Sequence, residues 1–123
     1  MPKKSILVID DDVAVRAMLC ECLQDVGYIV SEAGDGEMGL QSMEKGLPDL
    51  VITDIIMPKK DGLETVKEIR EKYPSVKVLA ISGGGRAKIG DFLELARKLG
   101  SDAVLSKPID IVELEKTVQT LIG

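Results

Sequence analysis

Short apolar runs alternate with amphipathic stretches along this chain, and that alternation constrains its fold more than any other feature. The apolar runs lie at residues 5–9, 28–30, 50–53, 76–81 and 103–105. Three of them are almost entirely aliphatic, which is typical of parallel strands that are covered on both faces. The sequence therefore predicts five strands that alternate with five helices in one parallel sheet.

The stretches between the strands have helical spacing, and residues that break helices end most of them. Their apolar positions are Val15, Met18, Leu19, Cys22, Leu23 and Val26 in the first, Leu40, Met43 and Leu47 in the second, Leu63, Val66, Ile69 and Tyr73 in the third, and Ile89, Phe92, Leu93, Ala96 and Leu99 in the fourth. The fifth carries Leu114, Val118 and Leu121, and it opens with Asp110 three residues before Glu113, as in a capping box. Right-handed crossovers then give a flavodoxin-like, doubly wound α/β fold with strand order 2-1-3-4-5.

Length and composition predict a single globular domain over residues 1–123, with a core that is aliphatic because the chain has two Tyr, one Phe and no Trp. No apolar run is long enough to span a membrane and no signal-peptide pattern opens the chain, so we expect a cytoplasmic protein. A formal net charge of -5 argues against direct nucleic-acid binding. Cys20 and Cys22 lie two apart on a predicted helix, where they can neither pair nor chelate, and we expect both to be reduced.

Polar residues gather where the predicted strands end. They are Asp10, Asp11 and Asp12 after the first strand, Asp54 at the end of the third, Ser82 at the end of the fourth and Lys107 after the fifth. The carboxyl ends of parallel strands meet at one rim, so these side chains should share a site, except Asp12, which can cap the first helix.

Crowded carboxylates stay ionised only if a cation offsets their charge, and both Mg²⁺ and the Lys107 ammonium can do so. Mg²⁺ binds a few carboxylates and leaves room for phosphate oxygens. The sequence therefore predicts a phosphoryl-transfer site. Asp54 is the predicted nucleophile because it stands alone at the end of a buried strand, whereas the pair Asp10 and Asp11 suits metal binding.

These residues stand in segments that resemble the receiver domains of bacterial two-component response regulators, including the single-domain chemotaxis type. The matching segments, at residues 9–12, 53–62, 80–83 and 105–108, read IDDD, TDIIMPKKDG, AISG and LSKP. The resemblance covers essentially the whole chain, and the spacing between the segments matches as well.

The resemblance implies a role for each residue of the site. Asp54 would be phosphorylated, and Asp10, Asp11, Asp54 and the backbone carbonyl of Ile56 would hold Mg²⁺ or Mn²⁺. Ser82 and Lys107 would contact the phosphoryl group, and the bond between Lys107 and Pro108 would be cis. The chain would be a switch and not an enzyme, although it would assist its own phosphorylation and autodephosphorylation.

The family also implies protein partners. The donor would be a phosphohistidine on a sensor histidine kinase or a histidine phosphotransfer protein, and this chain has no His that could carry the intermediate itself. A downstream effector protein or an output domain would read the switch. The fourth helix has a mixed-charge face that suits a partner, a phosphorylation-dependent homodimer or plain solvent; it comprises Arg86, Lys88, Asp91, Glu94, Arg97 and Lys98.

Three features depart from the family. Val104 stands where the family has Tyr or Phe, so no aromatic side chain can switch there. Residues 83–85 are all glycine, and we expect this loop either to become more ordered on phosphorylation or simply to fit a tight bend. Ile56 and Gly84 occupy the positions that tune hydrolysis in the family, and neither can orient water through a polar side chain, so we expect water access past Ile56 to set the phosphoryl lifetime.

Three other functions fit the sequence less well than the switch. A haloacid-dehalogenase-type phosphatase would use Asp10 as nucleophile and Asp12 two residues on, but Ala14 stands where that family has Thr or Val, and no segment is long enough for a substrate cap. A pseudo-receiver that binds partners constitutively finds no support because all the key residues are present. A flavin carrier needs a hydroxyl-rich loop after the first strand, where this chain has acids.

Overall fold

Five parallel strands form one sheet in the computed structural model, which describes residues 3–55, 62–82 and 89–123. They are β1 (Ser5–Ile9), β2 (Ile29–Ala33), β3 (Leu50–Asp54), β4 (Lys77–Ser82) and β5 (Ala103–Ser106). The strand order is β2-β1-β3-β4-β5, which confirms the predicted flavodoxin-like topology. The central strands β1 and β3 are almost fully buried, as their aliphatic sequences require.

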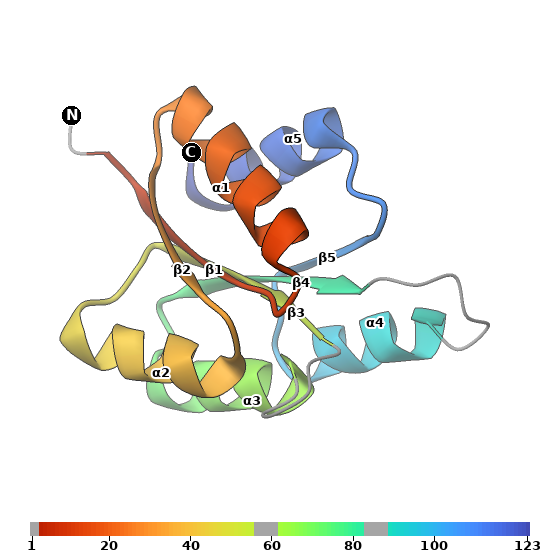
Figure 1. The fold of residues 1–123 in the computed structure, drawn as a ribbon. Helices are drawn as coiled ribbons and strands as arrows, with labels where there is room; N and C mark the ends of the chain where they lie inside the picture. The colour runs from red at the N-terminus through yellow and green to blue at the C-terminus, as the bar shows by residue number, and fades with distance from the viewer. Residues whose placement is uncertain (1–2, 56–61, 83–88) are drawn as a thin grey trace.

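Helices cover both faces of the sheet (Figure 1). Helices α1 (Val13–Val26) and α5 (Ile111–Ile122) lie on one face, and α2 (Gly36–Lys45), α3 (Gly62–Lys72) and α4 (Ile89–Lys98) lie on the other. The apolar core is divided in the same way. Under α1 and α5 it includes Leu19, Leu23, Leu114 and Val118, and under α2 and α3 it includes Leu40, Met43, Val66 and Ile69.

Aspartates begin three of the helices. The carboxylate of Asp12 accepts hydrogen bonds from the backbone N–H groups of Ala14 and Val15, and Asp110 caps α5 in the same manner. Both caps were predicted. Asp35 caps α2 by accepting the N–H of Met38 at 2.8 Å, and this cap was not predicted. The rim ends of α1 and α5 are therefore fixed by local side-chain bonds.

Some predicted boundaries and faces were wrong. Strand β2 begins after Tyr28 and continues through Ala33, and β4 begins at Lys77. Helix α2 ends at Lys45, so Leu47 is not helical and is half exposed. In α1 the buried cysteine is Cys20 and not Cys22; both are free thiols.

An arginine network joins the elements at the end of the sheet opposite the rim. Arg70 of α3 donates to the carbonyl oxygens of Gly100 at 3.0 Å and Pro74 at 2.8 Å, and it pairs with the Asp102 carboxylate at 2.7 Å. The same carboxylate accepts the N–H of Val78 at the start of β4. The starts of β4 and β5 are thereby tied to α3. Within the described ranges, no helix is long and apolar enough to cross a bilayer.

Candidate functional site

Four strands bring the predicted site residues to one rim of the sheet. Asp10 directly follows β1, Asp54 ends β3, Ser82 ends β4, and Lys107 directly follows β5. The parallel register explains why they meet, since Asp54 lies opposite Ile81 and Ser82 lies opposite Ser106. The predicted convergence is confirmed for the side chains of Asp10, Asp54 and Lys107, which meet in ion pairs.

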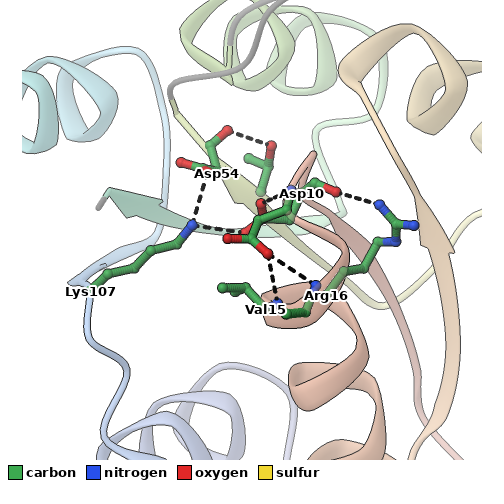
Figure 2. Close-up of polar contacts among 8 residues, drawn as sticks. Asp10, Val15, Arg16, Asp54 and Lys107 are labelled. Atoms are coloured by element: carbon green, nitrogen blue, oxygen red, sulfur yellow. Dashed lines mark hydrogen bonds and ion pairs between the residues drawn. The ribbon is translucent and has the colours of Figure 1, made fainter. Parts of the chain in front are cut away.

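Lys107 bridges the two buried acids of the site. Its Nζ lies 3.0 Å from Oδ2 of Asp10 and 3.0 Å from Oδ2 of Asp54, and Figure 2 shows the side chain reaching toward both. Burial by itself lowers the pKa of this ammonium, but the hydrogen bonds and negative charges of Asp54 and Asp10 outweigh it, so the pKa is raised. Lys107 therefore remains a cation at neutral pH and offsets part of the acidic charge. The bond between Lys107 and Pro108 is cis, as the resemblance implied.

Asp10 is held in place through both its backbone and its side chain. Its side chain is 1% exposed, and its backbone N–H donates to the carbonyl of Ala33 in β2 at 3.2 Å. Its Oδ1 accepts the N–H of Asp12 at 2.9 Å, and its carbonyl oxygen accepts Nη1 of Arg16 at 2.7 Å. Both its backbone and its carboxylate are thus held in one orientation.

The acids at the rim are arranged as a metal site requires. Asp10, Asp11 and Asp54 each offer a carboxylate oxygen, and these oxygens lie within 4.8 Å of one another. Two of the acids are buried and Asp11 is exposed, so the cluster opens to solvent on one side. Hard carboxylate oxygens are the ligands that Mg²⁺ and Mn²⁺ take, so the residues fit such an ion. The Ile56 carbonyl, predicted as a further ligand, lies outside the described residues.

Ser82 ends β4 at the same rim of the sheet. It is fully buried, and within the described part of the chain its Oγ has no hydrogen-bond partner. Its carbonyl oxygen accepts the backbone N–H of Lys107 at 2.7 Å, which ties the two residues together. A buried hydroxyl without a partner is costly, and an incoming oxygen ligand would satisfy it.

The backbone around Asp54 is held by its neighbours. The N–H of Ile55 donates to the carbonyl oxygen of Ile81 at 2.9 Å. Gly62 is the first residue of α3, and its N–H donates to the carbonyl oxygen of Ile55 at 2.7 Å. Helix α3 approaches so closely that a Cβ on Gly62 would collide with the carbonyl of Asp54 and with Cα of Ile55. Glycine is therefore required at this position to let the helix contact the end of β3.

Val104 packs in a small apolar cluster next to the site. It lies partly buried against Ile55, Ala80 and Ala96, with Leu63 nearby. The position of the family aromatic is thus filled by an aliphatic side chain. Other predicted features lie outside the described residues: the loop at 83–85, the Ile56 and Gly84 positions, Arg86 and Lys88. In α4, Glu94, Arg97 and Lys98 are exposed, as predicted.

Arg16 is the residue of the site that sequence reasoning missed. Besides its bond to Asp10, it pairs through Nε with Oε1 of Glu32 at 2.8 Å. Its position one turn into the helix after the acidic pair is only a weak indication that it contacts the site. Its ion-pair partner Glu32 lies sixteen residues away, so the spacing of residues does not show the pair.

Comparisons with known proteins agree with this geometry. The model of the response regulator receiver domain family matches residues 6–119. The chain is 35% identical to the transcriptional regulatory protein PdtaR of Mycobacterium tuberculosis, over 98% of this chain and 57% of that protein. It is 33% identical to the alkaline phosphatase synthesis transcriptional regulatory protein PhoP of Bacillus subtilis, over 97% of this chain and 48% of PhoP. The chain thus spans about half the length of these curated relatives.

Solved structures show the same fold over full-length matches. A putative response regulator from Chloroflexus aurantiacus superposes with a TM-score of 0.90 at 29% identity, covering 98% of both chains. The chemotaxis protein CheY4 of Vibrio cholerae superposes with a TM-score of 0.86 at 30% identity, covering 98% of this chain and 99% of CheY4. None of these matches supports the haloacid-dehalogenase alternative. On the family match, the relatives and the fold together, this chain belongs to the response regulator receiver domains of two-component systems.

Proposed function

We propose that the chain works as a phosphorylation switch whose acceptor is Asp54. One observation carries the proposal: the Lys107 ammonium lies 3.0 Å from two buried carboxylates at the ends of different strands. The next strand along the same rim ends in Ser82, whose buried hydroxyl has no partner among the described residues. A purely structural ion pair would need neither the second acid nor the hydroxyl. Together these groups form a place where negative charge can be added and neutralised.

Asp10, Asp11 and Asp54 would hold the metal ion, Mg²⁺ or Mn²⁺. When bound, the ion would offset the negative charge of the phosphoryl oxygens and of the acids around them. The open side of the cluster at Asp11 gives the ion and the donor a route to the buried acids.

The chemical step is a transfer of the phosphoryl group between two side chains. A carboxylate oxygen of Asp54 forms a bond to phosphorus while the bond between phosphorus and the imidazole nitrogen of the donor breaks, and the imidazole leaves with its electron pair. Lys107 and Ser82 stabilise the oxygens of the group in transit through charge and a hydrogen bond. The phosphoryl group of the product carries about -1.5 to -2 of charge in place of the single negative charge of the carboxylate, and Lys107 lies close enough to balance part of it.

The partners follow from this chemistry. A sensor histidine kinase or a histidine phosphotransfer protein supplies the phosphohistidine, because this chain contains no His. Autodephosphorylation is the attack of water on the same phosphorus, which releases inorganic phosphate and restores the Asp54 carboxylate. A downstream effector or an output domain distinguishes the two charge states of the site.

Incubation with acetyl phosphate and Mg²⁺, followed by mass spectrometry, tests the proposal. We expect one phosphoryl group on Asp54, none in Asp54→Asn, and full modification in the matched control Asp49→Asn, whose carboxylate lies at the start of β3 and binds Ser5. Ser82→Ala should slow the reaction by about 100-fold because it removes a donor to the developing charge. Modification at Asp10 would support the phosphatase instead, and an unmodified chain would refute the switch.

A further inference from the structure

The Arg16 side chain joins three parts of the molecule next to the proposed metal site. It extends from α1, donates through Nη1 to the carbonyl oxygen of Asp10 at 2.7 Å, and pairs through Nε with Glu32 of β2 at 2.8 Å. The side chain is 17% exposed although it carries a full charge. Burial of a guanidinium to this degree needs good hydrogen-bonding partners, and this one has both a carbonyl and a carboxylate.

The bond to the Asp10 carbonyl controls more than one residue. A peptide group is planar, so the carbonyl of Asp10 and the N–H of Asp11 turn as one unit. By holding the carbonyl, Arg16 fixes the plane that joins two of the three acids of the cluster. The Asp10 carboxylate is held on its other side by Lys107, and Figure 2 shows Lys107 and Arg16 approaching Asp10 from opposite sides.

Glu32 in turn orients Arg16. Its carboxylate is 54% exposed, so the ion pair by itself adds little to stability, but it occupies the Nε of the guanidinium and leaves Nη1 directed at Asp10. Cys20, one turn further along α1, faces the same carboxylate: burial is the main cause of the raised pKa of that thiol, and the charge of Glu32 adds to it. Glu32 therefore lies against the α1 face that carries Arg16.

We propose that Arg16, oriented by Glu32, is a positioning residue that presets the peptide between Asp10 and Asp11 for binding a divalent cation. This inference rests on the proposed function, because it assumes that the acids hold Mg²⁺. Residues that hydrogen-bond to metal ligands set the orientation of those ligands. Their loss commonly lowers the affinity for the metal by about 10- to 100-fold. A guanidinium bonded to the ligand's own backbone is such a partner.

The test is a calorimetric titration of the unphosphorylated chain with MgCl₂, which requires no phosphoryl transfer. We expect Arg16→Met to raise the Kd for Mg²⁺ about tenfold, since methionine keeps an apolar stem and loses every donor. Arg16→Lys should recover part of the affinity, because an ammonium can still donate to the Asp10 carbonyl. Glu32→Gln keeps a hydrogen-bond acceptor for Arg16 but not the charge. Its Kd for Mg²⁺ should lie between those of wild type and Arg16→Met.

Arg70→Met is the matched control. Arg70 also makes bonds to carbonyl oxygens and pairs with a carboxylate, but at the opposite end of the sheet. It should lower the urea midpoint and leave the Kd for Mg²⁺ unchanged. The inference is overturned if the Kd of Arg16→Met for Mg²⁺ stays within about twofold of the wild-type Kd, or if Arg70→Met weakens Mg²⁺ binding as much as Arg16→Met does. If the wild-type chain binds no Mg²⁺, the proposed metal site fails together with this role of Arg16.

Discussion

Replacing Gly62 with alanine should damage phosphorylation without touching any charged group. The new Cβ would lie 2.8 Å from the carbonyl carbon of Asp54 and closer still to its oxygen, where 3.4 Å is an ordinary contact. The carbonyl carbon would thus have to retreat by at least about 0.6 Å, and the oxygen by more. The contacts are all with backbone atoms, of Asp54 at the end of β3 and of Ile55 directly after it, so no flexible side chain can absorb the change.

Two magnitudes follow from this displacement. Crowding of a packed interior by one methyl group costs about 1–3 kcal/mol of unfolding free energy. A shift of about 1 Å in a reacting group can cost roughly 100-fold in rate, so phosphorylation by acetyl phosphate should fall by about that factor. The loss of rate should therefore exceed what the fraction of unfolded chain explains.

Urea denaturation and the initial rate of Asp54 phosphorylation, measured by mass spectrometry on the same samples, are the assays. Gly46→Ala is the control, because nothing lies within 4 Å of a Cβ at Gly46 and its backbone is extended. This variant should match wild type in both assays. A Gly62→Ala chain that is folded and phosphorylated at the wild-type rate would refute the reasoning.

Two further predictions concern groups outside the acid cluster. Burial, with a contribution from Glu32, raises the pKa of the Cys20 thiol from 9.0 to about 11. The folded state therefore favours the neutral thiol, and the stability that this group provides is present below pH 9 and lost as the pH rises to 11. Urea titrations across that range should show a steeper loss for wild type than for Cys20→Ala, and equal slopes would contradict the shift. Asp110→Ala should cost about 1 kcal/mol because the N–H groups of Val112 and Glu113 lose their acceptor, whereas Asp110→Asn should retain most of the stability; equal losses in thermal melts would count against the cap.

The sheet order and the rim could be predicted because the signals are local. Aliphatic runs mark the strands, and Asp54 and Ser82 directly end two of them. Parallel pairing then leaves no choice about which ends meet. The caps Asp12 and Asp110 were equally accessible, because a cap bonds to residues two or three positions away.

Features that depend on distant neighbours could not be predicted in this way. Strand β2 lies at the sheet edge with Ser31 and Glu32 exposed, so the apolar pattern that would have marked its end is absent. Which of the two cysteines, Cys20 or Cys22, is buried depends on how α1 is rotated against the sheet and α5. The role of Arg16 depends on a carbonyl and on a carboxylate from another strand, and neither is visible in the spacing of residues.

The Arg70 network restrains the end of the sheet opposite the rim. Asp102 and Arg70 pin the starts of β4 and β5, whereas Ser82 and Lys107 lie at the opposite ends, joined by their own backbone bond. If β4 and β5 move when Asp54 is phosphorylated, these contacts restrain their starts, so we expect the displacement to be larger at the Ser82 and Lys107 ends. We therefore expect a protein that distinguishes the two charge states to contact the Lys107 end of β5, and a protein that contacts the start of β5 to bind both states alike.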